Sequence, residues 1–135
     1  MKKIILCIAL IFSIVGIAQQ KNIIPIDSCL LATKSVLYKT NAHASYYHDK
    51  FNGRKTASGR KFDNNDFTAA HKTFPFGTKL KITNEKNKKF VLVEVIDRGP
   101  FVKGREIDLS KRAFMDIASN KKSGVVYVTI EILKN

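Results

Sequence analysis

The chain has 135 residues and a mass of 15.2 kDa, which is enough for one domain of ordinary size. Its hydrophobic fraction of 44% and charged fraction of 26% are those of a globular protein, and two Cys and three Pro exclude a disulfide scaffold and a collagen-like chain. Twenty-four Lys and Arg against 11 Asp and Glu give a formal net charge of +13 at pH 7, which favours an anionic partner.

An apolar run opens the chain after a short basic start. Residues 4–18 form this run, which is shorter than the ~20 residues that a helix needs to cross a bilayer. Gly16 and Ala18 place small residues at −3 and −1 of a cleavage site before Gln19. We therefore expect a signal peptide over residues 1–18, export to the periplasm or the exterior, and a mature chain without a transmembrane helix. The alternative is a single membrane anchor or a buried core helix.

Cys29 would be the one thiol of the mature chain, since cleavage removes Cys7. The residues before it, 26–28, do not form a lipobox, so we expect no lipid anchor and a free thiol. Residues 19–43 hold Pro25 and show no sustained hydrophobic period. They are interpreted as a linker or N-terminal arm that precedes a domain over residues 44–135.

The positive charge indicates the anions of a bacterial cell wall, because an exported chain rarely meets nucleic acid. Cleavage would remove two Lys and no acidic residue, which leaves 22 − 11 = +11. Stem peptides of peptidoglycan carry carboxylates, although dispersed Lys also keeps a small protein soluble. We expect a monomer at the envelope periphery whose partner is peptidoglycan and not nucleic acid, with another polyanion such as extracellular DNA as the alternative.

The segment after residue 44 is expected to be mainly β. Residues 79–83 alternate polar and apolar side chains, and residues 89–96 follow after a polar turn, which predicts a hairpin. A last strand is expected over residues 126–132, and a short helix over 111–118 with Ser110 as its N-cap. Many short strands with one helix favour a small closed barrel, which leaves no open sheet edge.

No common cofactor or metal motif is present in the sequence. It contains no Gly-rich phosphate loop, no zinc pair of Cys and no Gly-x-Ser-x-Gly elbow. The three histidines, His43, His48 and His71, lack metal-ligand spacing with one another. We expect no cofactor and no metal.

Two aspartates stand where a carboxylate could do chemistry. Asp97 ends an apolar run before Gly99-Pro100, which forces a turn, and Asp108 lies between Ile107 and Leu109. Apolar neighbours would disfavour the charged form of Asp108 and suit it to donate a proton. Structural roles stay open: Asp97 could pair with an arginine or cap a turn, and Asp108 could cap the helix.

Six fragments in order give the chain a family resemblance over about residues 44–133. They are ASYY (44–47), NGRKTASG (52–59), FTAAH (67–71), PFGT (75–78), DRGPF (97–101) and GREIDLS (104–110). Together they resemble the RlpA (rare lipoprotein A) family. The resemblance implies a six-stranded double-psi β-barrel with one or two short helices, the fold of expansins. It also implies lytic transglycosylation of peptidoglycan glycan strands.

In that reaction a general acid protonates the oxygen between N-acetylmuramic acid and N-acetylglucosamine, and the muramic C6 hydroxyl then attacks C1. The internal nucleophile reduces the need for a second carboxylate. The resemblance makes Asp108 the acid/base, His71 a group that orients the sugar or stabilises charge (or a structural histidine), and Asp97 a second acidic group that tunes Asp108. The expected substrate-binding residues are Ser45, Tyr46, Tyr47, Arg60 and Arg98.

The chain departs from the family at a functional position. Members commonly have Glu after the Ser-Gly of the second fragment, where this chain has Arg60. Tyr46 stands in place of the usual Trp, and His48 in place of the usual Gly. The loss of the Glu predicts weak activity. It also gives weight to an alternative function, an expansin-like protein that binds or loosens wall glycan without cleaving it.

Overall fold

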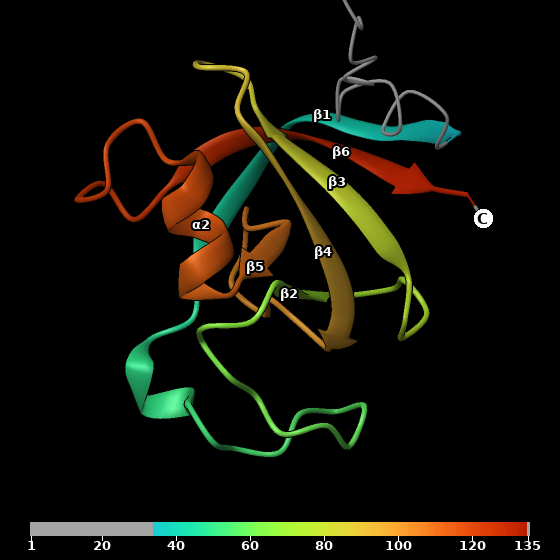
Figure 1. The fold of residues 1–135 in the computed structure, drawn as a ribbon, viewed down its shortest axis with the longest axis vertical. Coiled ribbons are helices and arrows are strands. Elements are labelled where there is room, and N and C mark those ends of the chain that lie inside the picture. Colours follow the sequence, from blue (N-terminus) through green and yellow to red (C-terminus); the bar gives the residue numbers. More distant parts are fainter. Residues whose placement is uncertain (1–33, 135) are drawn as a thin grey trace, which may run out of the picture.

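Six strands close into a barrel in the computed structural model, which describes residues 34–134. The order around the barrel is β1-β5-β2-β4-β3-β6 (Figure 1). The elements in chain order are β1 (Ser35–Tyr46), the 3₁₀ helix η1 (Asp49–Phe51), β2 (Thr68–His71), β3 (Lys79–Asn84), β4 (Phe90–Asp97), β5 (Ile107–Leu109), α2 (Lys111–Ile117) and β6 (Val126–Leu133). The expected mainly-β closed barrel is therefore confirmed.

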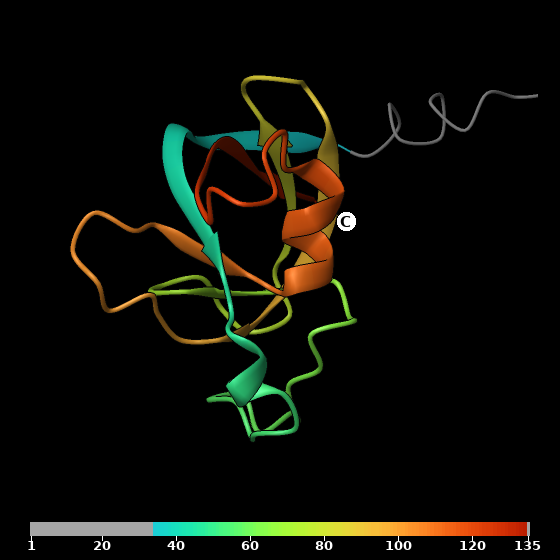
Figure 2. The ribbon, with the colours of Figure 1, turned by 90° about the vertical axis from the view of Figure 1, so that its left-hand side faces the viewer.

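Two of the six strand pairings are parallel, and two long connections between strands carry the candidate site. β1 pairs with β5 and β2 pairs with β4 in parallel, whereas the other pairings are antiparallel. The connection from β1 to β2 is a long excursion over residues 47–67 beyond one end of the barrel, and the loop 98–106, which connects β4 to β5, projects beside it (Figures 1 and 2).

The barrel interior is filled by alternate residues of the long strands. Leu80 and Ile82 of β3 and Val128 and Ile130 of β6 are fully buried, while their neighbours in sequence face outward. The helix α2 covers one side of the barrel with the buried residues Ala113, Phe114 and Ile117. Full burial of a large apolar side chain such as Phe114 contributes about 1.5–3 kcal/mol to the stability of the fold. The hydrophobic periods of about 3.6 residues in the helix and 2 residues in the strands thus match the faces that are buried in the structure.

Most local elements lie where the sequence predicts them. The hairpin is formed by β3 and β4, the last strand is β6, and α2 begins after Ser110, whose Oγ accepts a hydrogen bond from the backbone N–H of Ala113. The helix ends at Ile117, one residue before the expected end.

The start of the barrel was predicted too late. β1 begins at Ser35 and pairs with β6 from Ser35 opposite Leu133, so residues 35–43 belong to the barrel and not to an arm. Two register shifts interrupt this pairing, and Asn41 adopts a φ of 50°, so the strand has no regular alternation for a sequence pattern to detect. The expected signal peptide, the rest of the arm and Cys29 lie outside the described residues.

Between residues 34 and 134, no helix has the length and apolar character needed to cross a membrane.

Candidate active site

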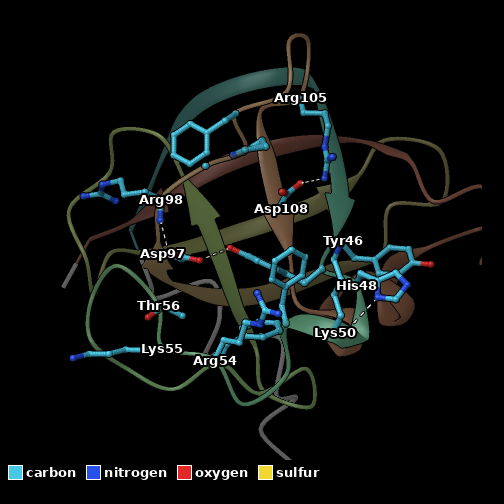
Figure 3. Close-up of a pocket in the computed structure, with 16 residues that line it drawn as sticks. Tyr46, His48, Lys50, Arg54, Lys55, Thr56, Asp97, Arg98, Arg105 and Asp108 are labelled. Atoms are coloured by element: carbon cyan, nitrogen blue, oxygen red, sulfur yellow. Dashed lines mark hydrogen bonds and ion pairs between the residues drawn. The ribbon is translucent and has the colours of Figure 1, made fainter.

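A pocket of about 570 Å³ opens where the excursion 47–67 meets the loop 98–106, and it contains both aspartates singled out in the sequence (Figure 3). Its walls carry more cationic than acidic side chains. The lining residues used below are Tyr46, Tyr47, Asp97, Arg98, Phe101, Arg105 and Asp108, with Lys50, Arg54 and Lys55 as further cationic groups.

Asp108 is held by strand pairing and by two donors. The register of β5 places it opposite Ser45 of β1 on one side and Ala70 of β2 on the other. Its Oδ1 accepts hydrogen bonds from Oγ of Ser45 at 2.6 Å and from Nη2 of Arg105 at 2.5 Å. Arg105 also contacts the Ser45 hydroxyl. Within residues 34–134 the other carboxylate oxygen, Oδ2, accepts no hydrogen bond, so it is the oxygen available to a ligand.

The apolar surroundings expected for Asp108 are not those of its carboxyl group. Ile107 and Leu109 are fully buried in the core, and strand alternation directs the side chain between them to the opposite face. That carboxyl group is 15% exposed and lies beside a guanidinium. The environment of this carboxyl group is therefore polar and positively charged. The apolar environment that we expected from its sequence neighbours is wrong.

Asp97 is fixed through both of its carboxylate oxygens. Oδ2 accepts a hydrogen bond from the hydroxyl of Tyr47 at 2.6 Å, and Oδ1 accepts one from the backbone N–H of Ala57 and one from that of Arg98, both at 2.9 Å. Burial, followed by the hydrogen bond to Asp97, raises the pKa of Tyr47. The phenol therefore stays protonated and donates, and Asp97 ties the excursion to the end of β4.

His71 lies behind the pocket wall and does not line it. Its side chain is 1% exposed and stacked on Phe74, with ring centroids 4.0 Å apart. Nδ1 accepts hydrogen bonds from the backbone N–H groups of Thr73 and Phe74, which leaves the proton of the neutral ring on Nε2. Burial lowers the pKa of His71, so the ring is neutral at pH 7. These contacts describe a histidine that fixes a turn.

Glu106 is also directed away from the pocket. Its carboxylate accepts a hydrogen bond from Nζ of Lys39 at 2.6 Å and lies 3.4 Å from Nε2 of His71. Burial opposes ionisation of Glu106, but the contacts with Lys39 and His71 together outweigh it and lower the pKa of Glu106. This carboxylate, which immediately precedes β5, thus contacts Lys39 and His71 and not the pocket.

Arg60 lies outside the pocket lining and forms an ion pair with a strand of the barrel. Its Nη1 is 2.8 Å from Oε2 of Glu94 on β4, and Nζ of Lys79 is 3.1 Å from the same oxygen. The hydrogen bond from Arg60 is the largest factor that lowers the pKa of Glu94. The cation beside Asp108 is Arg105, and Arg60, expected to bind substrate, does not line the pocket.

The other residues expected to bind substrate lie at the pocket or against it. Tyr46 lines the pocket, with its ring 4.7 Å from that of Phe114, and Ser45 lies behind Asp108. Arg98 lines the pocket too, and its guanidinium donates to the carbonyl of Phe74 and lies 3.9 Å from the ring centroid of Phe76.

Sequence reasoning gave no role to Arg105, although the residue is part of the last family fragment. The signal that could have identified it is its position three residues before Asp108, but only the fold shows that the intervening chain turns the guanidinium back onto the carboxylate. Among residues 34–134, no group of three or more His, Cys, Asp or Glu side chains is arranged to hold a metal ion.

The fold resembles solved double-psi barrels. The Streptomyces papain inhibitor superposes with a TM-score of 0.56 at 23% identity, over 75% of this chain and 96% of that chain. The apo expansin of Clavibacter michiganensis gives 0.57 at 19% identity, over 76% of this chain and 52% of that chain. The expected six-stranded double-psi barrel is thus confirmed, and these likenesses show the fold alone.

Sequence comparison is more specific. The family described as "Lytic transglycolase" matches residues 39–130. The endolytic peptidoglycan transglycosylase RlpA of Pasteurella multocida is 50% identical over 97 residues, which are 72% of this chain and 33% of the relative. The protein of the same name from Rickettsia felis is 45% identical over 107 residues, 77% of this chain and 46% of the relative. The chain spans less than half the length of these relatives. On these matches, the chain belongs to the lytic transglycolase family.

Proposed function

We propose that this domain cleaves the glycan strands of peptidoglycan as an endolytic lytic transglycosylase. The observation that carries the proposal is the fixed Asp108 in the pocket, with one carboxylate oxygen bound by Ser45 and Arg105 and the other available to substrate. The names of relatives that are 45–50% identical over this domain support the substrate and the reaction.

Asp108 carries the proton in both halves of the reaction. Protonated at Oδ2, it donates to the glycosidic oxygen as the bond from that oxygen to C1 of the muramic sugar breaks. The carboxylate that results then accepts the proton of the C6 hydroxyl as O6 bonds to C1, which restores the acid and consumes no water. Arg105 and Ser45 hold the carboxylate in place and stabilise it between the two steps.

Asp97 has a different role, since its two oxygens are occupied by three donors. Neither of these oxygens is free to protonate the glycosidic oxygen. A fixed negative charge in the same pocket favours the oxocarbenium-like transition state that develops at C1. Tyr47, held protonated, orients this carboxylate.

A second candidate function is glycan binding or loosening without cleavage. The observation that favours it is Arg60, which replaces the Glu common in the family and which pairs with Glu94 outside the pocket. If the missing Glu is required for chemistry, the pocket would retain substrate contacts and lose turnover.

Incubation with purified sacculi and mass spectrometry of the soluble products separates the two functions. We expect 1,6-anhydromuramyl ends from the wild-type protein and none from Asp108→Asn. Asp116→Asn is the matched control, because Asp116 is an exposed carboxylate of α2 outside the pocket lining. Sedimentation of the wild-type protein with the wall and no anhydro product would instead establish the binding function.

The proposed setting is the bacterial envelope, where the substrate lies. The names of the relatives, which act on peptidoglycan, support an envelope location, and the apolar run at residues 4–18 supports export. We propose a monomer without a lipid anchor that begins near Gln19. Intact-mass measurement of the protein from its host tests this, and an unprocessed Met1 or an added diacylglyceryl mass would refute it.

A further inference from the structure

Four phenylalanine side chains are exposed among the described residues, and one of them differs from the others. Cationic groups lie over the rings of three, Phe67, Phe76 and Phe90, at 5.3, 3.9 and 4.8 Å from the ring centroids. The fourth, Phe101, is 86% exposed, and no aromatic or cationic partner of its ring is found within residues 34–134. The ring of Phe101 is therefore accessible to a ligand.

The open ring belongs to the wall of the candidate active site. Phe101 lines the pocket that contains Asp97 and Asp108. The next residue, Val102, is 54% exposed, so the tip of the loop is apolar where the surrounding surface is polar and basic. Exposed apolar groups at the edge of a pocket with convergent polar groups are typical of ligand contact.

The loop that carries this ring, 98–106, is fixed on both sides. The guanidinium of Arg98 donates to the carbonyl of Phe74 at 2.8 Å, and Nζ of Lys72 donates to the carbonyl of Arg105 at 3.1 Å. An aromatic side chain on a fixed loop loses little conformational entropy when it binds a ligand.

The backbone of Gly99 lies next to the ring. This residue has a φ of 123°, which favours glycine, and a Cβ atom there would lie 3.6 Å from Cε2 of Phe101. One side of the ring therefore rests against bare backbone, and the other side is presented outward.

We propose that Phe101 is a sugar-stacking residue, which binds the C–H face of a pyranose ring of the glycan strand next to the bond that Asp108 cleaves. A β-linked pyranose carries its hydroxyls at the rim and axial C–H groups on its faces. Such a face is apolar and matches the negative face of an aromatic ring. The identity of the glycan rests on the proposed function; the stacking rests on the exposure, the fixed loop and the position in the pocket.

Binding isotherms with sacculi and product release, measured on the same variants, test this inference. We expect Phe101→Ala to weaken binding about tenfold, the scale of a lost aromatic contact. Product release should fall more at low than at high sacculus concentration, because the loss is one of binding. Phe101→Trp should restore both measurements. Phe90→Ala is the matched control, since Phe90 is an exposed ring outside the pocket lining.

Each outcome decides the matter. Wild-type binding by Phe101→Ala, an equal loss in Phe90→Ala, or no recovery in Phe101→Trp would overturn the stacking role. If the wild-type protein binds sacculi and releases no anhydro product, the proposed catalysis is wrong. The binding isotherms then remain as the test of whether Phe101 stacks on the glycan. If it neither binds nor cleaves, both proposals are wrong.

Discussion

Charge reversal at position 60 tests whether Arg60 acts through its ion pair with Glu94. In Arg60→Glu two carboxylates would face each other where Nη1 and Oε2 now lie 2.8 Å apart. In Arg60→Glu/Glu94→Arg the charges are exchanged, but the new arginine lies beside Lys79, which now contacts Glu94 at 3.1 Å. We therefore expect the single variant to lose stability and the double variant to regain most, though not all, of it.

The magnitude follows from exposure. The side chains of Arg60 and Glu94 are 50% and 27% exposed, and ion pairs in such positions are worth about 0.2–1 kcal/mol because water and salt screen them. Loss of the attraction and a comparable repulsion lower the free energy of unfolding by about 1 kcal/mol in Arg60→Glu. For a domain of about 100 residues this corresponds to ~4–8 °C in Tm.

The stability contributed by the Arg60–Glu94 ion pair also depends on pH. Arg60, by its hydrogen bond, lowers the pKa of Glu94 below its ordinary value of 4.5. A carboxyl group whose pKa is lowered by folding contributes stability above its unfolded pKa, and this contribution is lost as pH falls through the folded value. The difference in Tm between wild type and Arg60→Glu should be complete at pH 7 and shrink below about pH 4.5.

The double-mutant cycle consists of the wild type, Arg60→Glu, Glu94→Arg and the double variant. Thermal unfolding of these four proteins at low and high salt measures the coupling free energy between positions 60 and 94. Lys61→Glu is the matched control, since it makes the same charge change at the adjacent exposed residue, which forms no ion pair within residues 34–134. The reasoning fails if Arg60→Glu unfolds at the same temperature as Lys61→Glu, or if the exchange recovers nothing. In the sacculus assay, more product from Arg60→Glu than from Lys61→Glu would show that the family's Glu contributes to turnover from outside the pocket lining.

Three further predictions concern the pocket. Asp108→Asn should reduce anhydromuramyl release by ~10²–10⁴-fold while sedimentation with sacculi persists; near-wild-type turnover in a folded variant would place the chemistry elsewhere. Arg105→Gln should lower turnover, and Arg105→Lys should recover part of it. Equal activity of the wild type and both variants would show that the guanidinium does not position Asp108. Tyr47→Phe should cost ~1.5–3 kcal/mol in urea unfolding, since it removes a donor to a carboxylate. Because folding raises the pKa of Tyr47, this cost should be complete below pH 10 and shrink above it, and a cost independent of alkaline pH would contradict the assignment.

Local patterns in the sequence were sufficient for the elements that depend on local interactions. The hairpin of β3 and β4 and the helix α2 were predictable because the polar turn, the alternation and the Ser110 cap act within a few residues. The start of β1 was not, because its register shifts and the positive φ of Asn41 disrupt the alternation, and its pairing with β6 spans the whole domain.

For the site, the family fragments singled out Asp97 and Asp108 as acidic groups that act together, and both line the same pocket. They could not show which charges the fold brings together. Arg60 pairs with a strand 34 residues away, and His71 is turned toward backbone N–H groups, both of which depend on tertiary contacts. The apolar neighbours of Asp108 in sequence do not surround its carboxyl group, because adjacent residues in a strand occupy opposite faces.

The parallel pairing of β1 with β5 has a consequence for when the proposed activity can arise. Ser45 and Asp108 are 63 residues apart in the chain, and the contact between them exists only when the two strands are in register. Contacts of such long range form late in folding, since the chain must close a large loop before they are gained. An unfolded polypeptide therefore carries all the residues of the pocket and none of its geometry. Under the proposed function and export, cleavage of the wall would begin only after the barrel has closed.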